Sequence, residues 1–350
     1  MSRKNITISI LSLIGVNVFL LSYILNPSGE ALSGRLIDKF DGSANEAPAE
    51  KNKESASRVS NHEAISPVMS GNSVIYYEKG TGRVFKTSLE TNTTETISES
   101  ILRDFLSAVW APDKRQVIAK FYGPLGNEFR YYSYDTKKTI PLDRNVRSAV
   151  FSPNSSQIAY FKSTPEGGEI YISNPDGSDS HRIFKTAFLD TDLKWLADDL
   201  IVVSAINSAD QLHYVFSLNR DGEIRKIFDG LMKLDTAWRG DGAAVIYSSF
   251  DNGSLESRIL NLNTGTEVKI SKNIAAGQCS WGTNSVVCVS RQDGGSGDEI
   301  FLINPQGDII SLTKTSQSFN PSEVMLSPDE SRLIILNRPD NLIYSLRINQ

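Results

Sequence analysis

The chain has 350 residues, of which 39% are hydrophobic and 22% are charged, and this balance excludes a wholly disordered protein. Lysine and arginine total 36 against 41 aspartate and glutamate residues, and the net charge of -5 disfavours a strongly basic nucleic-acid-binding protein. The presence of two cysteines and three histidines excludes a disulfide-rich scaffold and a four-cysteine zinc site, and disfavours a multi-histidine metal site.

The first predicted element is a transmembrane helix over residues 6–25, a run of 20 residues without a charged side chain. At about 1.5 Å per residue, this run reaches about 30 Å, the thickness of a bilayer's hydrocarbon core. Arg3 and Lys4 precede it. The positive-inside rule therefore predicts a short cytoplasmic tail over residues 1–5, with the rest of the chain outside the cytoplasmic membrane, in the periplasm or the extracellular space.

The alternative for this segment is a cleaved signal peptide, which would make the protein a secreted one. Residues 31–33, Ala-Leu-Ser, offer a small-x-small cleavage site. The apolar run is longer than the core of a usual signal peptide, so we favour an uncleaved signal-anchor.

Residues 26–56 follow the apolar run and are poor in large apolar side chains. Such a composition cannot bury enough surface to offset the conformational entropy of the chain. The segment is therefore predicted to be a flexible linker.

From residue 57 to residue 350 the chain repeats itself in seven units. Each unit begins with an apolar stretch that ends in a large side chain, followed by a turn and a second run of β-branched and aliphatic residues. All four tryptophans fall at the large-residue position, which favours packing between neighbouring units over a carbohydrate-stacking site. The positions, 41 to 45 residues apart, are Met69, Trp110, Phe151, Trp195, Trp238, Trp281 and Leu326.

A third strand-like run, a turn and a short fourth run follow in each of the first six units. The turns are rich in Asn, Asp, Pro and Gly, as in NPDGS from Asn174 and NPQGD from Asn304, and they supply the backbone conformations that tight hairpins need. Four strands in about 43 residues, without helical periodicity, are typical of a β-propeller blade. The sequence therefore predicts an all-β fold over residues 57–350, a seven-bladed β-propeller with four-stranded blades.

The seventh unit ends at Gln350 after its third strand, so its fourth strand is missing from this end of the chain. Residues 57–60, Ser-Arg-Val-Ser, are similar to fourth strands such as residues 268–271, Val-Lys-Ile-Ser. We predict that residues 58–60 pair beside residues 341–347 and close the ring, because an open ring would leave long unpaired edges.

Three of the first turns share a proline pattern after a Trp, Phe or Leu: APD at residues 111–113, SPN at 152–154 and SPD at 327–329. This pattern resembles the TolB-like and WD-like propeller repeat, and the resemblance covers residues 57–350. The units at Trp195, Trp238 and Trp281 lack the Ser-Pro pair. TolB also has a separate N-terminal α/β domain, for which residues 26–56 are too short, so we carry over no role in the Tol complex.

The resemblance implies that the innermost strand of each blade lines a central channel. It places the first–second and third–fourth turns on one face, and the second–third loops and the connections between blades on the other. The loops of this second face are longer and more varied, and variable loops on a rigid scaffold are where binding surfaces usually lie. We therefore predict that this face binds a protein or peptide partner in the cell envelope.

Charged residues just before or at the start of inner strands are the candidate binding residues of that face. A ring of carboxylates near a channel mouth suits a cation or a basic peptide. Arginine and lysine lie between the aspartates, however, and that mixture is typical of ordinary solvated charge. The candidates are Arg103, Asp104, Arg144, Asp190, Asp192, Lys233 and Asp235.

Patterns for catalysis are absent from the sequence: it has no G-x-S-x-G motif, P-loop or dinucleotide-binding fingerprint. We predict no catalytic residue, no metal ligands, no cofactor and no nucleic-acid partner. The main hypothesis is a membrane-anchored, extracytoplasmic β-propeller that acts as a protein- or peptide-binding scaffold. The alternative is a calcium-dependent hydrolase or lyase at the channel mouth. Nothing in the sequence indicates the oligomeric state.

The two cysteines, Cys279 and Cys288, are nine residues apart in the sixth unit. If residues 282–285 form a four-residue turn, Trp281 faces Val286, and counting outward sets Cys279 opposite Cys288. Cross-strand neighbours lie near disulfide distance. The two residues are therefore expected to form either a disulfide, which an exported domain permits, or a pair of buried thiols.

Overall fold

The computed structural model describes residues 55–207, 209–292, 294 and 296–348. All of them lie in one compact unit, Glu50–Gln350. The predicted tail, the predicted anchor at residues 6–25 and nearly all of the predicted linker lie outside the described residues. Within the described part of the chain, no helix is long and apolar enough to cross a membrane.

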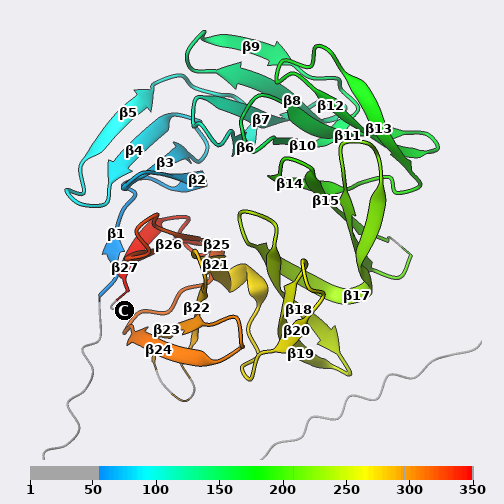
Figure 1. Cartoon of the computed structure of the whole chain (residues 1–350). Coiled ribbons are helices and arrows are strands. Elements are labelled where there is room, and N and C mark those ends of the chain that lie inside the picture. Colours follow the sequence, from blue (N-terminus) through cyan, green and yellow to red (C-terminus); the bar gives the residue numbers. More distant parts are fainter. Residues whose placement is uncertain (1–54, 208, 293, 295, 349–350) are drawn as a thin grey trace, which may run out of the picture. The chain divides into compact units, whose positions relative to one another are not determined.

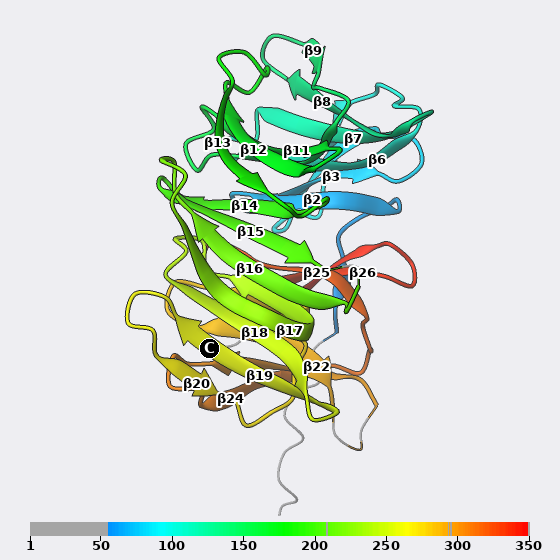
Figure 2. The same ribbon diagram turned by 90° about the vertical axis from the view of Figure 1, so that its right-hand side faces the viewer.

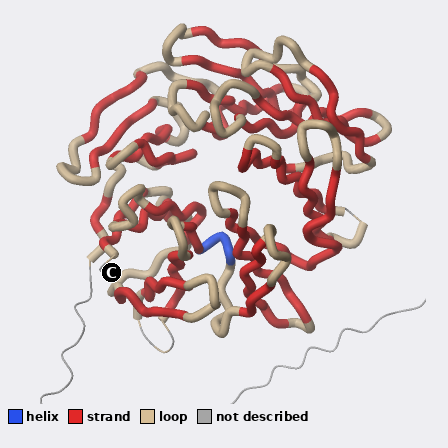
Figure 3. The backbone as a smooth tube through the Cα atoms, in the orientation of Figure 1, coloured by secondary structure: helices blue, strands red, loops and turns tan. Residues whose placement is uncertain are grey.

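The described residues form antiparallel sheets, five with four strands and one with seven (Figure 1). Apart from strands, the described part contains only one short 3-10 helix (Figure 3). The first sheet comprises β2 (Ala64–Ser70), β3 (Ser73–Glu78), β4 (Val84–Ser88) and β5 (Thr94–Ser98). The second comprises β6 (Phe105–Trp110), β7 (Gln116–Gly123), β8 (Gly126–Ser133) and β9 (Lys138–Pro141). The third comprises β10 (Val146–Phe151), β11 (Ile158–Thr164), β12 (Gly167–Ser173) and β13 (His181–Thr186).

The seven-stranded sheet and two more four-stranded sheets complete the described structure. The seven-stranded sheet comprises β14 (Asp192–Ala197), β15 (Leu200–Ile206), β16 (Leu212–Leu218), β17 (Ile224–Trp238), β18 (Ala244–Asp251), β19 (Ser254–Asn261) and β20 (Glu267–Lys269). The helix η1 (Ala276–Gln278) precedes the sheet of β21 (Cys279–Trp281), β22 (Val286–Arg291), β23 (Asp298–Ile303) and β24 (Ile309–Lys314). The last sheet comprises β25 (Pro321–Leu326), β26 (Arg332–Asn337), β27 (Ile343–Arg347) and β1 (Ser57–Arg58).

The sheets follow one another around a central axis, with β2, β6, β10, β14, β21 and β25 nearest the centre (Figures 1 and 2). Neighbours in each sheet are consecutive in sequence, except for β1. Four-stranded antiparallel sheets arranged radially are the architecture of a β-propeller. The predicted all-β fold and its four-stranded repeat are thus confirmed.

The seven-stranded sheet forms because one long strand, β17, joins the group β14–β16 to the group β18–β20. Its first part pairs with β16, from Ile224 to Met232, and its last part pairs with β18, from Asp235 to Trp238. The sequence predicts a connection over residues 229–235, and this expectation is wrong. The chain turns there through Gly230 and Lys233, both at positive φ, and the register shifts between Met232 and Asp235. Pairing on both sides keeps the segment in strand conformation.

The N-terminal strand β1 is the outermost strand of the last sheet, where it pairs with β27 in the order β1-β27-β26-β25. The amide of Val59 donates to the carbonyl of Ile343 at 2.8 Å, and the Ile343 amide donates to Ser60 Oγ at 2.9 Å. Both side chains at positions 59 and 60 are buried. The predicted closure of the ring by residues 58–60 is therefore confirmed.

Apolar side chains are buried between neighbouring sheets rather than within a single central core. One cluster joins Tyr76 of the first sheet to Ile334 and Ile343 of the last. Another joins Phe161 of the third sheet to Trp195 of the next. Each sheet therefore buries both of its faces against neighbours, as in stacked-sheet packing.

Two of the tryptophans also bond across the boundary between sheets. Trp110 Nε1 donates to the carbonyl of Ser66 on β2 at 2.9 Å, and Trp281 Nε1 donates to the carbonyl of Ala237 on β17 at 2.8 Å. Each pair is 44 residues apart, about one repeat. The indole at this position therefore links an inner strand to the inner strand of the preceding sheet, which agrees with its interpretation as an inter-unit contact.

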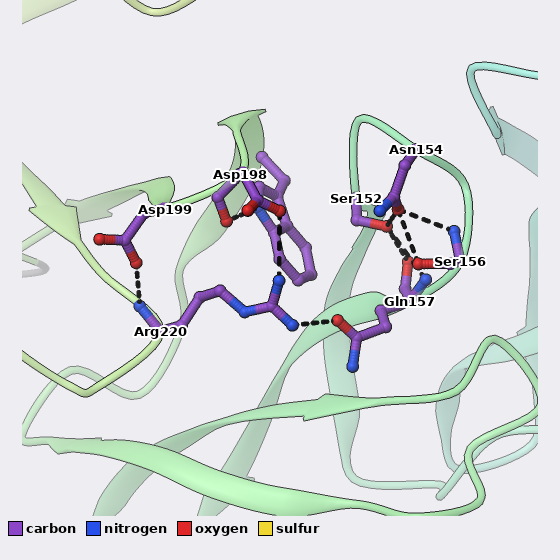
Figure 4. Close-up of polar contacts among 8 residues, drawn as sticks. Ser152, Asn154, Ser156, Gln157, Asp198, Asp199 and Arg220 are labelled. Carbon is purple, nitrogen blue, oxygen red and sulfur yellow. Dashed lines mark hydrogen bonds and ion pairs between the residues drawn. The ribbon is translucent and has the colours of Figure 1, made fainter.

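Polar side chains join the first turns of neighbouring sheets (Figure 4). The Arg220 guanidinium, in the β16–β17 turn, donates to Asp198 Oδ1 at 3.3 Å and to Gln157 Oε1 in the preceding sheet. Within the SPN turn, Ser152 Oγ donates to Asn154 Oδ1 at 2.7 Å, and the same oxygen accepts the Ser156 amide. The proline turns are thus closed by their own side chains.

The cysteines lie opposite each other on β21 and β22, in the register Cys279↔Cys288 and Trp281↔Val286 that the sequence predicts. The structure contains the disulfide, with the two Sγ atoms 2.09 Å apart. Both cysteines are buried. The bond joins the shortest innermost strand of the described sheets, β21 with three residues, to its neighbour.

Replacing Trp110 or Trp281 by Phe removes an indole that bonds a carbonyl of another sheet. We expect each variant to lower the free energy of unfolding by about 1–3 kcal/mol, in addition to the effect of the smaller ring, because the carbonyl loses its hydrogen-bond donor. The matched control is Trp238→Phe, whose indole bonds only Thr236 of its own strand at 3.1 Å. Urea denaturation compares the three, and an equal loss in all three would contradict the assigned role.

Candidate binding face

The order of strands divides the loops between two faces of the described unit. In each antiparallel sheet, the start of the innermost strand lies at the same end as the second–third hairpin and the end of the fourth strand. We call this end the connection face, since the sheet-to-sheet connections lie there. The opposite end, with the first–second and third–fourth hairpins, is the turn face.

Several innermost strands begin with an irregular register on the connection face. The pairing shifts between Ile65 and Val68 on β2, between Phe105 and Ser107 on β6, and between Pro321 and Glu323 on β25. A shift of this kind leaves the intervening residue outside the ladder and re-aims its side chain, as bulges beside functional sites often do. The connection face therefore presents irregular backbone next to the channel.

Arg103 and Asp104, two of the candidates, lie in the β5–β6 connection and are exposed. Both line a cavity of about 500 Å³ between the sheet β2–β5 and the sheet β6–β9. Asp104 has a positive φ of 61°, and its carbonyl accepts the amide of Tyr122 at 2.8 Å. That bond ties the connection to the end of β7.

Arg144 and Asp190 lie in two other connections, Asp192 is the first residue of β14, and all three are exposed. Burial raises the pKa of Asp190, and the neighbouring charge of Asp192 raises it further, while Lys120 and Arg147 act in the opposite direction. Asp190 thus stands among charges of both signs. This arrangement resembles the mixed solvated charge that the sequence left as an alternative.

Lys233 and Asp235, the last two candidates, lie on β17. Lys233 Nζ is 4.6 Å from the centroid of the Phe250 ring, in a cation–π contact. Asp235 Oδ2 accepts the amide of Gly277 at 2.6 Å, and its Oδ1 accepts the amide of Thr236 at 3.0 Å. The Asp235 carboxylate therefore holds the segment around η1 against β17.

The candidates are distributed over four segments, and the structure brings together Arg103 with Asp104 and Asp190 with Asp192. Across residues 55–348, apart from the few not described, no group of three or more His, Cys, Asp or Glu could hold a metal ion.

The sequence analysis missed the aromatic residues that line the cavity beside Arg103. Tyr77, Phe121, Tyr132 and Tyr134 line it together with Arg130. The dense aromatic run from Tyr131 to Tyr134 is the sequence feature that points to these residues. Because aromatic residues in a strand are usually core residues, the run alone does not distinguish a cavity wall from packing.

Most of the large apolar side chains that are exposed in the described part of the chain lie on the connection face. They occupy the connections, the starts of inner strands and the second–third hairpins. Exposed apolar groups gathered on one face mark interaction surfaces. These residues are Ile101, Leu106, Tyr122, Leu125, Leu189, Ile206, Met232 and Phe250, and the other exposed ones are Ile97, Val109, Ile224 and Ile310.

Glu323 lies on the innermost strand β25, and its surroundings strongly shift the pKa of its carboxyl group. The Glu323 side chain is exposed to solvent, and the neighbouring protein still affects its carboxyl group. Burial raises the pKa of Glu323 to about 7, and only Lys194 of β14 opposes this shift. Both residues lie on innermost strands, which belong to different sheets.

No model of a known protein family matches the chain. In sequence it is similar to the Tol-Pal system protein TolB of Anaeromyxobacter dehalogenans, with 26% identity over 92 residues. The match covers 26% of this chain and 21% of that protein, so the chain matches about a fifth of the relative's length.

Solved structures share the fold at low sequence identity. An oligogalacturonate lyase in complex with manganese has a TM-score of 0.62 at 11% identity, covering 86% of this chain and 96% of that one. The β-propeller domain of the trilobed protease from Pyrococcus furiosus has a TM-score of 0.55 at 12% identity, covering 82% and 95%. These structures show that the chain has a β-propeller fold, and the sequence match shows that part of it is similar to TolB. The same fold serves enzymes, so fold alone does not determine this chain's function.

Replacing Glu323 by Gln should change the dependence of stability on pH. A folded-state pKa of about 7, above the ordinary value of 4.5, means that the folded chain holds this proton more tightly than the unfolded chain. The free energy of unfolding therefore falls as the pH rises from about 4.5 to about 7. We expect Glu323→Gln to raise the Tm at pH 8 and to have little effect at pH 4.5, in thermal scans against a Glu90→Gln control. An equal change in Tm at both pH values would contradict a raised pKa of Glu323.

Proposed function

We propose that the protein is a single-pass, membrane-anchored β-propeller outside the cytoplasmic membrane, whose connection face binds a protein or peptide partner. The observation that carries this proposal is the gathering of exposed apolar side chains on that face. Cores between the sheets hold the strands rigid, and the loops between them differ in length and charge. Such a surface suits recognition of a partner.

The proposed propeller has seven blades. Five four-stranded sheets account for five of them, and the seven-stranded sheet provides the other two, which share β17. The shift in register between Met232 and Asp235 supports a boundary within that strand. The seven repeats of the sequence agree with this division.

The proposed location rests on residues 6–25 and on the disulfide. The apolar segment has the length of a membrane span, and Arg3 and Lys4 favour a cytoplasmic N-terminus. Disulfides persist in oxidising compartments outside the cytoplasm, which supports a periplasmic or extracellular propeller. Secretion after signal cleavage is the alternative, and the N-terminal sequence of the mature protein distinguishes the two.

A photo-crosslinking amino acid placed on each face tests the binding proposal in intact cells. Tyr122, Leu125 and Phe250 are positions on the connection face, and Ile224 and Ile310 are matched exposed apolar positions away from it. We expect discrete crosslinked products from the first group only, because a partner excludes water from that face. Products of equal yield from both groups, or none from the connection face, would refute the proposed surface.

The state of Cys279 and Cys288 tests the proposed location. If the propeller lies outside the cytoplasm, protein denatured directly from cells should take up no thiol reagent until a reductant is added, and then two equivalents. Mass spectrometry measures the uptake. Free thiols in freshly harvested wild-type protein would argue for a reducing compartment, and the variant Cys279→Ser sets the signal of one free thiol.

A further inference from the structure

The cavity beside Arg103 has the size and composition of a ligand site. Its volume of about 500 Å³ is within the range of roughly 300–1,000 Å³ typical of small-ligand pockets. The apolar cluster behind it contains only three buried residues, Ile75, Tyr77 and Val84, and the side chains packed on these are partly exposed. The first two sheets thus leave between them a space that their own side chains do not fill.

Tyrosine rings form a neutral and well-fixed wall of this cavity. The Trp110 ring stacks on Tyr134 at a centroid distance of 5.7 Å, and Tyr132 meets Tyr134 edge-on at 4.9 Å. The hydroxyls of Tyr77 and Tyr134 bond to each other at 3.0 Å. Burial raises the pKa of Tyr134 to about 12, so the wall carries no charge near neutral pH. Such a surface accepts an apolar or aromatic side chain by stacking.

Two arginines of the lining differ in whether they have partners. The Arg130 guanidinium lies 4.5 Å from the centroid of Phe121 and bonds Glu128 at 3.1 Å. Arg103 has no hydrogen bond or ion pair with any described residue, and it is exposed at the cavity. An unpaired guanidinium beside an apolar cavity is suited to a carboxylate, which it binds in a bidentate manner.

The entrance to the cavity combines apolar and polar groups. Ile101, which lines the cavity, is 71% exposed. The backbone bond between Tyr122 and Asp104 sets these two residues side by side. The Asp104 carboxylate also has no partner among the described residues, and it is an acceptor suited to the amide groups of a peptide.

We propose that this cavity binds an extended peptide segment in which a bulky apolar or aromatic side chain is adjacent to a carboxylate. The apolar side chain enters against Tyr132 and Phe121, the carboxylate pairs with Arg103, and Asp104 accepts a peptide amide. Ile101 covers the exposed side of the segment. This inference rests on the proposed function, since it names the class of ligand that one part of the connection face takes.

Titration calorimetry of the full-length chain in detergent tests the proposal with three peptides. The probe is acetyl-Gly-Phe-Glu-Gly-amide, one comparator has Gln in place of Glu, and the other has Gly in place of Phe. We expect saturable binding of the probe with one site per chain, and about tenfold weaker binding of each comparator, since a charge-assisted bond or a buried ring is lost. Binding that does not distinguish the three peptides, or no binding of the probe, would overturn the assignment.

The variant Arg103→Gln separates the role of this side chain from general effects of charge. It should bind the Glu and Gln peptides equally, at the level of the wild type with the Gln peptide, and keep the preference for Phe over Gly. Its matched control is Arg225→Gln, an exposed arginine near the start of β17 at the turn face, which should leave all three affinities unchanged. Circular dichroism checks that both variants are folded, and equal losses in the two would refute a specific role of Arg103.

The peptide experiment and the crosslinking experiment fail independently. If the crosslinks at Tyr122 and Leu125 form while the peptides are not distinguished, the connection face is a binding surface and the assigned ligand class is wrong. If neither experiment succeeds, the proposed function falls together with this inference.

Discussion

The backbone pairing between β1 and β27 is the constraint on which the rest of the structure depends. Every sheet buries apolar side chains on both faces, so each needs a neighbour on either side. The first and last sheets become neighbours only when the ring is closed. Val59, Tyr76 and Ile343 belong to the cluster formed at that junction, and the pairing of β1 brings them together.

Local sequence determines much of this fold. Turn residues and strand length recur with the repeat, so the four-stranded units, the closing strand and the register of Cys279 with Cys288 follow from counting along the chain. The continuity of β17 does not follow in this way. Residues 229–235 look like a connection in sequence, and pairing first with β16 and then with β18 makes them part of one strand, although Gly230 and Lys233 have positive φ.

The binding face is less accessible to sequence reasoning, because partners come from separate repeats. Asp235 looks like a free channel-mouth charge, yet its carboxylate bonds Gly277, 42 residues away. Arg103 looks the same in sequence and has no such bond with a described residue. Tyr77, Tyr134 and Arg103 lie in different parts of two repeats, and nothing in the pattern of either repeat shows that packing leaves a space among them. The loops thus indicate a candidate binding face, whereas the contacts of each candidate residue depend on the three-dimensional structure.

The closure of the ring also affects the order in which the protein folds as it is synthesised. The strand β1 is among the first of the described residues to be synthesised, and its partner β27 is among the last. Throughout translation, the growing chain holds an unpaired strand whose proper neighbour does not yet exist. Sheets of the middle can assemble from consecutive strands as they emerge, but the circle is completed in a single final event. Until then, β1 and the exposed edge of the first sheet are open to pairing with other chains, and a chain that stops short of residue 343 never loses that exposure.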